Sequence, residues 1–359
     1  MSDSAGMNEV YAPPRIRTRG DPRPVVPGAS SGTKTPAKSR HTRFPHRIRG
    51  GDRGRHPLES PKATAREERA PVELTVHGIE SVIGRVRHEG CRTLDLRSVR
   101  FVDPYGLPLL DLLIRDGIEC ERPLEIAWPT HGPVVGWMRA MGRYADLDRT
   151  ARPRSRLPDV RRALQPITPI EDETAIGRLV DGFDARLAAR YPLDSSPRRA
   201  LVRIMIELFQ NIPQHSNATG DVADPHGIAA MQDYRDGIVL AIADKGIGMR
   251  ASLSLRDPAL ASTDAQALDA VVLRGVSRFA DPGRGEELMR IFRMVRSWDG
   301  TLAVRTGNAL LLHDPAEGGD VHDVAPFPGV QVAVCIPQRV FGIERVDAEG
   351  NPRFNEHDE

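Results

Sequence analysis

The sequence predicts two folded units of different class behind a disordered N-terminal tail. We expect an α/β unit over residues 71–150 and an α+β two-layer sandwich over residues 169–341. Residues 1–70 have hardly any apolar periodicity, and strand-like and helix-like patterns then alternate. From residue 169 onward, two helix-like segments precede strands that are mostly joined as hairpins. Alternating strands and helices are typical of α/β layering, whereas helices followed by antiparallel strands are typical of an α+β sandwich.

The tail is basic and rich in Arg, Pro, Gly and Ser. Residues 1–70 carry 15 Lys and Arg against 7 Asp and Glu, while the chain of 359 residues has a net charge of +1, so the remainder is acidic. Because so few apolar residues cannot offset the entropy lost on ordering, we expect this tail to be disordered. Its charge leaves contact with nucleic acid open, beside the simpler interpretation of a solvated tail. A true start further downstream is another alternative.

In the first unit, β-branched residues and alternation predict the strands, and amphipathic patterns predict the helices. A basic linker punctuated by proline is expected over 151–168. The strands are expected in PVELTVHG (71–78), CRTLDLRSVRFV (91–102) and PLEIAWP (123–129), and the helices in YGLPLLDLLIRDGI (105–118) and PVVGWMRAMGRYADL (133–147).

In the second unit, helix and hairpin signals follow one another in order. Arg235-Asp236-Gly237 is typical of a hairpin turn, and Gly307-Asn308 predicts a second one. A polar, irregular stretch is expected from residue 249, and a C-terminal tail over 342–359. The helices are expected over 170–191, 195–211 and 286–298, and the strands in GIAAMQDYRDGIVLAIAD (227–244) and VQVAVCIP (330–337).

The segment ELFQNIPQHS (207–216) places three polar side chains on one face of an otherwise apolar helix. Glu207, Asn211 and His215 fall at i, i+4 and i+8, a spacing that brings them to the same face. A buried helix that keeps such a polar face indicates a site, although a solvated face is the plainer alternative.

Two glycine motifs follow in the same unit. DKGIG (244–248) comes directly after a strand, where Gly246 and Gly248 permit a tight turn and Asp244 supplies a fixed acceptor. GRGEEL (283–288) opens a helix, where Gly283 and Gly285 leave backbone N–H groups exposed to an anion. Each motif alone is weak, since such turns are common.

The order of these motifs resembles the ATP-binding domain of the GHKL superfamily, which includes gyrase-type ATPases, ninety-kilodalton heat-shock chaperones, histidine kinases and anti-sigma serine kinases. The resemblance covers about 169–341 and implies ATP and Mg²⁺ as cofactors. It implies the following roles: Asn211 binds the metal, Glu207 is the general base, Asp244 accepts the adenine amino hydrogen, Gly246 and Gly248 approach the base, and Gly283 and Gly285 meet the phosphates. His215 fits a cofactor-site position of the anti-sigma kinases, and residues 249–282 would form the ATP lid.

Two residues depart from the superfamily pattern. Pro213 removes a helix hydrogen bond two residues after Asn211, so we expect the helix to kink or end there. Glu287 stands where relatives usually have Gly, and its carboxylate would repel phosphate if it faced the ligand. Both departures put turnover in doubt more than they do the fold.

The first unit resembles the STAS domains of anti-sigma factor antagonists. RTLDLRSVRFVDPYGLPLLDLLI (92–114) matches their strand, turn and helix, but Asp103-Pro104-Tyr105-Gly106 replaces the Asp-Ser-Ser-Gly turn whose serine is phosphorylated. We therefore expect a degenerate, STAS-like domain that is not a phospho-switch at this turn. The pairing favours the anti-sigma branch, because only 18 residues follow Phe341, too few for the transducer of a gyrase-type ATPase.

The predicted function is that of an ATP-binding regulatory protein, a protein serine kinase of the anti-sigma type or a kinase-like regulator. The alternative is a non-catalytic, ATP-gated binding switch. The resemblance implies a sigma factor or a STAS-type antagonist as partner and allows a homodimer. The three cysteines lie far apart in the sequence and no apolar run is long enough to span a membrane, so a cytoplasmic protein is expected.

Overall fold

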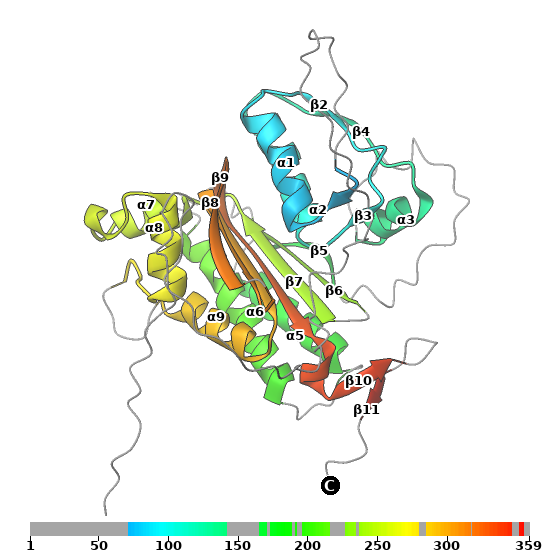
Figure 1. Cartoon of the computed structure of the whole chain (residues 1–359), viewed down its shortest axis with the longest axis vertical. Coiled ribbons are helices and arrows are strands. Elements are labelled where there is room, and N and C mark those ends of the chain that lie inside the picture. The colour runs from blue at the N-terminus through cyan, green and yellow to red at the C-terminus, as the bar shows by residue number, and fades with distance from the viewer. Residues whose placement is uncertain are drawn as a thin grey trace, which may run out of the picture.

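The computed structural model describes residues 71–141, 165–170, 173–188, 191, 196–215, 227–234, 237–279, 285–316, 318–346 and 352–354. The tail expected to be disordered (1–70) and most of the expected linker lie outside the described residues. The described part is a mixed α/β structure, in which small parallel β-α units precede a five-stranded antiparallel sheet with helices (Figure 1). Among the described residues, no helix is long and apolar enough to cross a membrane.

The first unit is built from two pairs of short parallel strands with helices between them. β1 pairs with β3, and β2 pairs with β4. Parallel neighbours need a crossover connection, and helices supply it here. In chain order the elements are β1 (Glu73–Leu74), α1 (Val76–Arg87), β2 (Thr93–Asp95), β3 (Phe101–Val102), α2 (Gly106–Glu119), β4 (Glu125–Ala127) and α3 (Gly132–Met141).

Helix α1 was not expected from the sequence. Its N-terminal residues lie in the segment 71–78, for which β-branched residues predicted a strand, and the strand is limited to β1. The buried residues of α1, Val76, Ile79, Val82 and Ile83, recur at helical spacing along one face. Tertiary burial of that face therefore overrides the β propensity of its valines and isoleucines.

The second unit contains one sheet in the order β5-β6-β7-β9-β8, with antiparallel pairing throughout. The predicted hairpin between β6 (Gly227–Asp233) and β7 (Gly237–Asp244) is confirmed. β5 (Gln165–Ile170) begins within the segment expected to be linker (151–168). Its two prolines suit an edge strand, because a missing N–H costs no hydrogen bond on the side that has no neighbouring strand.

The hairpin predicted at Gly307-Asn308 is wrong. β8 (Thr301–Asp314) and β9 (Gly318–Pro337) run past this point as one long hairpin, and their register shifts at Gly307. Gly307 has a φ of +55°, which serves a β-bulge as well as it serves a turn. The sequence signal therefore marked a positive φ correctly but could not distinguish these two uses.

Helices α5 (Glu173–Ala188), α6 (Ser196–His215) and α9 (Glu287–Ser297) cover one face of the sheet (Figure 1). α6 continues for two residues beyond Pro213, so that proline does not end the helix. The stretch from 249, expected to be irregular, is largely helical, with α7 (Gly248–Ser254), η2 (Pro258–Leu260), α8 (Asp264–Leu268) and the π-helix η3 (Asp269–Leu273). After the short helix η4 (Gln338–Phe341), β10 (Ile343–Val346) and β11 (Pro352–Phe354) pair within the expected C-terminal tail.

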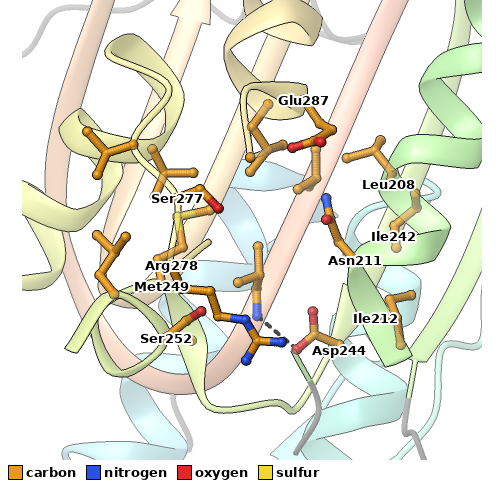
Figure 2. Close-up of a pocket in the computed structure, with 18 residues that line it drawn as sticks. Leu208, Asn211, Ile212, Ile242, Asp244, Met249, Ser252, Ser277, Arg278 and Glu287 are labelled. Carbon is orange, nitrogen blue, oxygen red and sulfur yellow. Dashed lines mark hydrogen bonds between the residues drawn. The ribbon is translucent and has the colours of Figure 1, made fainter. Parts of the chain in front are cut away.

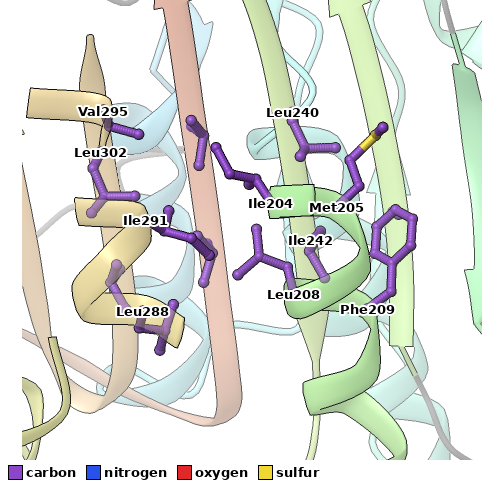
Figure 3. Close-up of a cluster of buried hydrophobic side chains, with 14 of the residues drawn as sticks. Ile204, Met205, Leu208, Phe209, Leu240, Ile242, Leu288, Ile291, Val295 and Leu302 are labelled. Carbon is purple, nitrogen blue, oxygen red and sulfur yellow. The ribbon is translucent and has the colours of Figure 1, made fainter. Parts of the chain in front are cut away.

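The inner face of the sheet forms an aliphatic core with these helices. Figure 3 shows Leu208 of α6 and Ile291 of α9 in one cluster of apolar side chains, with Leu240 and Ile242 of β7 beside α6. Ile238, Leu240 and Ile242 on β7 all belong to this core, because residues two apart on a strand share a face.

The outer face of the same sheet is covered by the first unit. Ala241 and Ala243 on β7 belong to a second core that includes Ile79 of α1 and Leu110 of α2. Several further sheet residues of this face are also alanines, namely Ala230, Ala303 and Ala333. Because alanine side chains are short, helices of the first unit can lie close to the strands. The sheet is thus buried on both faces.

Candidate functional site

A cavity lies where the end of β7 faces α6, α9 and the helical segment 248–279 (Figure 2). The empty space there, open solvent at the mouth included, is about 740 Å³. Most of its lining is apolar and comes from α6, β7, β9, α9 and the segment 248–279. The polar side chains that line it are Asn211, Asp244, Ser252, Ser277, Arg278 and Glu287.

Asp244, at the end of β7, presents a buried carboxylate to this cavity. One oxygen, Oδ1, accepts hydrogen bonds from the backbone N–H groups of Gly246 at 2.7 Å and Val330 at 3.2 Å. Burial raises the pKa of Asp244 to about 6, although these two hydrogen bonds act to lower it. The carboxylate is therefore fixed in direction and ionised at neutral pH.

The turn after Asp244 depends on two glycines with positive φ. Gly329 has a φ of +81°, and a Cβ there would lie 2.1 Å from the backbone oxygen of Asp244. Gly248 has a φ of +77°, and the hydroxyl of Thr306 accepts a hydrogen bond of 3.0 Å from the N–H of Met249 beside it. Only glycine permits these close approaches, which hold the turn against β8 and β9.

Asn211 and Glu207 lie one turn apart on α6 but have different surroundings. Asn211 lines the cavity, between Glu287 and Asp244 in Figure 2. Glu207 is not among the lining residues, and its Oε1 accepts a hydrogen bond of 2.9 Å from Nε of Arg203, one turn earlier on the same helix. His215 is the last residue of α6, and its side chain lies outside the described residues.

The N-terminus of α9 forms the other end of the cavity. Glu287 is the first residue of α9 and lines the cavity, as does Gly285 just before it. Gly283 lies outside the described residues, and Gly246 contributes its N–H to Asp244 but is not among the lining residues. The predicted site residues that the structure brings together are therefore Asn211, Asp244, Gly248 and Gly285.

Arg278 is a lining residue that the sequence analysis missed. Its side chain extends into the cavity from the segment after η3 (Figure 2), and burial lowers the pKa of its guanidinium. The backbone beside it is held by Arg256, whose Nη1 donates to the carbonyl oxygen of Ser277 at 2.9 Å. An arginine in a stretch interpreted as a mobile lid carries no local motif, so only the fold could reveal its position.

The cavity joins two chemically different regions. An aliphatic lining with one fixed carboxylate suits a flat, heteroaromatic ring that carries an N–H donor. At the other end, an amide side chain and a glycine before a helix N-terminus suit phosphate oxygens and a hard cation. The carboxylate of Glu287 opposes an anion at this end, and Arg278 is the one cationic side chain among the described lining residues.

The turn Asp103-Pro104-Tyr105-Gly106 lies far from solvent. Tyr105 is fully buried, and Asp103 Oδ1 accepts hydrogen bonds from the N–H groups of Tyr105 at 2.9 Å and Gly106 at 2.7 Å. The tyrosine hydroxyl has no hydrogen-bond partner among the described residues. A kinase could not reach this hydroxyl in the folded chain.

The chain was compared with family models and with curated proteins, and neither comparison found a match. Among the described residues, no group of three or more His, Cys, Asp or Glu side chains could hold a metal ion.

Proposed function

We propose that the chain is an ATP-binding regulatory protein, with a GHKL-type ATP-binding domain of the anti-sigma serine-kinase kind behind a degenerate STAS-like domain. The observation that carries the proposal is the single cavity lined by Asn211, Asp244, Gly248 and Gly285. These residues come from three motifs that are up to 74 positions apart in the sequence. Adenine would stack in the aliphatic part, with its amino group donating to Asp244.

Mg²⁺ fits the donor set as a cation bound jointly by the protein and ATP. Mg²⁺ commonly takes one or two protein oxygen ligands and completes its shell with phosphate oxygens and water. The amide oxygen of Asn211 can supply one such ligand without adding negative charge to the cavity. When bound, the ion would neutralise phosphate charge, which matters here because Glu287 lines the same cavity.

The same geometry favours the binding switch over the kinase. A general base must reach the proton it removes, either directly or through one water. The carboxylate of Glu207 is instead engaged by Arg203 on its own helix, outside the cavity lining. A kinase would require Glu207 to leave Arg203 and turn toward the cavity, whereas a nucleotide-gated switch requires no such movement.

The proposed partner is a regulatory protein, either a sigma factor or a STAS-type antagonist, and a homodimer is compatible with the proposal. Nucleotide binding would hold the segment 248–279 against the cavity, because that segment supplies Ser252, Ser277 and Arg278 to its lining. The surface of this segment would then differ between the free and the bound protein. A partner that contacts this surface would respond to nucleotide.

The test pairs nucleotide affinity with turnover in the full-length chain. Calorimetric titration with Mg·ATP gives the affinity, and labelled ATP distinguishes ADP release from phosphoprotein. We expect Asn211→Ala to weaken Mg·ATP binding at least about tenfold, because the metal loses its protein ligand. We expect Glu207→Ala to leave the affinity nearly unchanged.

Turnover then separates the two functions. A kinase that uses Glu207 should lose about 10²–10⁴-fold in rate in Glu207→Ala. A switch should show tight binding and no turnover in any variant. Wild-type affinity no better than millimolar with Mg²⁺ present would contradict the nucleotide proposal altogether.

A further inference from the structure

The nucleotide-site turn is joined to the first unit by one nearly buried lysine. Lys245 follows Asp244, and its side chain is only 8% exposed. Its Nζ lies 3.2 Å from Oδ1 of Asp116, and it also forms an ion pair with Glu119. Both carboxylates belong to the last turn of α2, more than 120 positions earlier in the sequence.

Strand alternation explains why neighbouring side chains face opposite units. On β7, Ile242 belongs to the inner core, whereas Ala243 belongs to the outer core shared with the first unit. Asp244 points to the inner side, like Ile242, and lines the cavity. By the same alternation, the side chain of residue 245 is expected on the outer side. Lys245 accordingly contacts α2. At the end of β7, Asp244 thus faces the cavity and the adjacent Lys245 faces the first unit.

The contacts of Asp244 make this connection stiff. Its side chain is held by the N–H groups of Gly246 and Val330, and its backbone oxygen accepts a hydrogen bond of 2.9 Å from Nε2 of Gln331. A displacement of α2 that pulls on Lys245 acts on the backbone of the turn that carries the Asp244 carboxylate, until the ion pairs with Asp116 and Glu119 break. Asp116 is itself tied to α1, because its Oδ2 lies 2.7 Å from Nη2 of Arg87.

We propose that Lys245 is a positioning residue through which the first unit sets the nucleotide affinity of the cavity. The proposal rests on the proposed function, since it concerns the same site. The position of α2 fixes Asp116 and Glu119, these carboxylates fix Lys245, and Lys245 fixes the angle at which Asp244 meets the base. A ligand or partner that shifts α2 would alter nucleotide binding without touching the cavity.

The experiment is a mutant cycle on the full-length chain, with Mg·ATP affinity measured by calorimetric titration. We expect Lys245→Met to weaken binding about tenfold, within the ~5–150-fold typical of coupling between sites. Asp116→Asn combined with Glu119→Gln should weaken it similarly. Adding Lys245→Met to that pair should produce little further loss, because the three groups act as one unit. Lys245→Arg, which keeps the charge, should retain most of the wild-type affinity.

Arg115→Met is the matched control. Arg115 is a cation on α2 whose Nε lies 2.9 Å from Oδ2 of Asp111 on the same helix, so its pairing does not reach the turn. We expect this variant to bind Mg·ATP as the wild type does. Thermal unfolding of every variant shows whether the fold is intact. Should Lys245→Met fail to fold, Glu119→Gln alone carries the test, because that carboxylate is 47% exposed.

Three results would overturn the proposal. They are wild-type affinity in Lys245→Met, fully additive losses in the cycle, or an equal loss in Arg115→Met. Each leaves the proposed function standing, provided that the wild type binds Mg·ATP. Absence of wild-type binding would instead refute the proposed function and this inference with it.

Discussion

At the scale of single residues, the cavity combines groups that favour a nucleotide with one group that opposes it. In the proposed nucleotide site, Asp244 would supply an acceptor and Asn211 a metal ligand, whereas Glu287 brings a second carboxylate to the end where phosphates would lie. Asp244 and Asn211 could be predicted from the sequence because their motifs are local. Arg278 could not, because its position depends on how the segment after η3 folds back over the cavity.

Nucleotide affinity should depend on the ionisation of Asp244. The pKa of this carboxyl is raised to about 6, so below pH 6 it gains a proton, loses its negative charge and becomes a weaker acceptor for the adenine amino group. We expect Mg·ATP affinity to fall as the pH drops from 7 to 5, about tenfold per pH unit once below the pKa. Asp244→Asn should bind weakly and without this pH dependence. A wild-type affinity equal at pH 7 and pH 5 would contradict the assigned role.

Removing the charge of Glu287 should strengthen nucleotide binding. Glu287→Gln keeps the size of the side chain while it removes the repulsion between its carboxylate and phosphate. We expect the dissociation constant for Mg·ATP to fall about three- to tenfold, and calorimetric titration at two salt concentrations should show the gain shrinking as salt screens the charge. Glu286→Gln serves as the control, because Glu286 is adjacent in sequence but does not line the cavity.

At the scale of elements, the turn that opens α2 carries a buried acid. Asp103 is fully buried, and one of its oxygens, Oδ2, has no hydrogen-bond partner among the described residues. Burial raises the pKa of Asp103 to about 7, against the opposing effect of hydrogen bonds from Gly106 and Tyr105. In the unfolded chain the same carboxyl titrates near 3.8. The folded state therefore holds a proton that the unfolded state releases.

This proton links stability to pH. Because the folded pKa lies above the unfolded value, the protonated Asp103 contributes to the free energy of unfolding. This contribution is fully present below about pH 4 and is lost as the pH rises toward 7. Above pH 7 the loss is on the order of 4 kcal/mol. We expect Asp103→Asn to be more favourable relative to wild type at pH 7.5 than at pH 5. Denaturant unfolding at both pH values measures this difference, and equal differences would argue against the buried acid.

Elements also show where sequence patterns stop being sufficient. The β6–β7 hairpin was predictable because its turn residues and alternation lie within a few positions of each other. α1 was not, because the same β-branched residues suit a strand until the outer face of the sheet is there to bury them. The part of the β8–β9 hairpin beyond Gly307 likewise depends on the first unit. Phe327, in this part of β9, lies in the core shared with that unit.

At the scale of the whole molecule, a buried ion pair connects the β8–β9 hairpin to the first unit. Arg305 of β8 is fully buried, and its Nε donates to Oε1 of Glu80 on α1 at 2.9 Å. Its other nitrogens donate to the carbonyl oxygen of Gly307 at 3.2 Å and to that of Ala325. The guanidinium also lies over the ring of Phe327, 5.6 Å from its centre. One side chain therefore satisfies acceptors from both units.

Breaking this pair should destabilise the molecule as a whole. Arg305→Met leaves the Glu80 carboxylate buried without its partner, and such losses typically cost about 3–5 kcal/mol. We expect the unfolding midpoint to fall while the two units still unfold together. Adding Glu80→Met should recover part of the loss, because no unpaired charge then remains buried. A double variant as unstable as Arg305→Met alone would show that packing, and not the charge, is at issue.

The alanines on the outer face of the sheet have a consequence for how such a chain can evolve. The outer face of the sheet is complementary to the first unit through five alanines, Ala230, Ala241, Ala243, Ala303 and Ala333. A different module packed there would leave cavities, because the alanine side chains are too short to fill the space. Substituting one alanine by leucine would wedge the present neighbour away. Exchange of the N-terminal module by recombination thus requires several coordinated changes in the sheet. The two halves of the sequence are expected to have diverged together rather than to have been shuffled among other proteins.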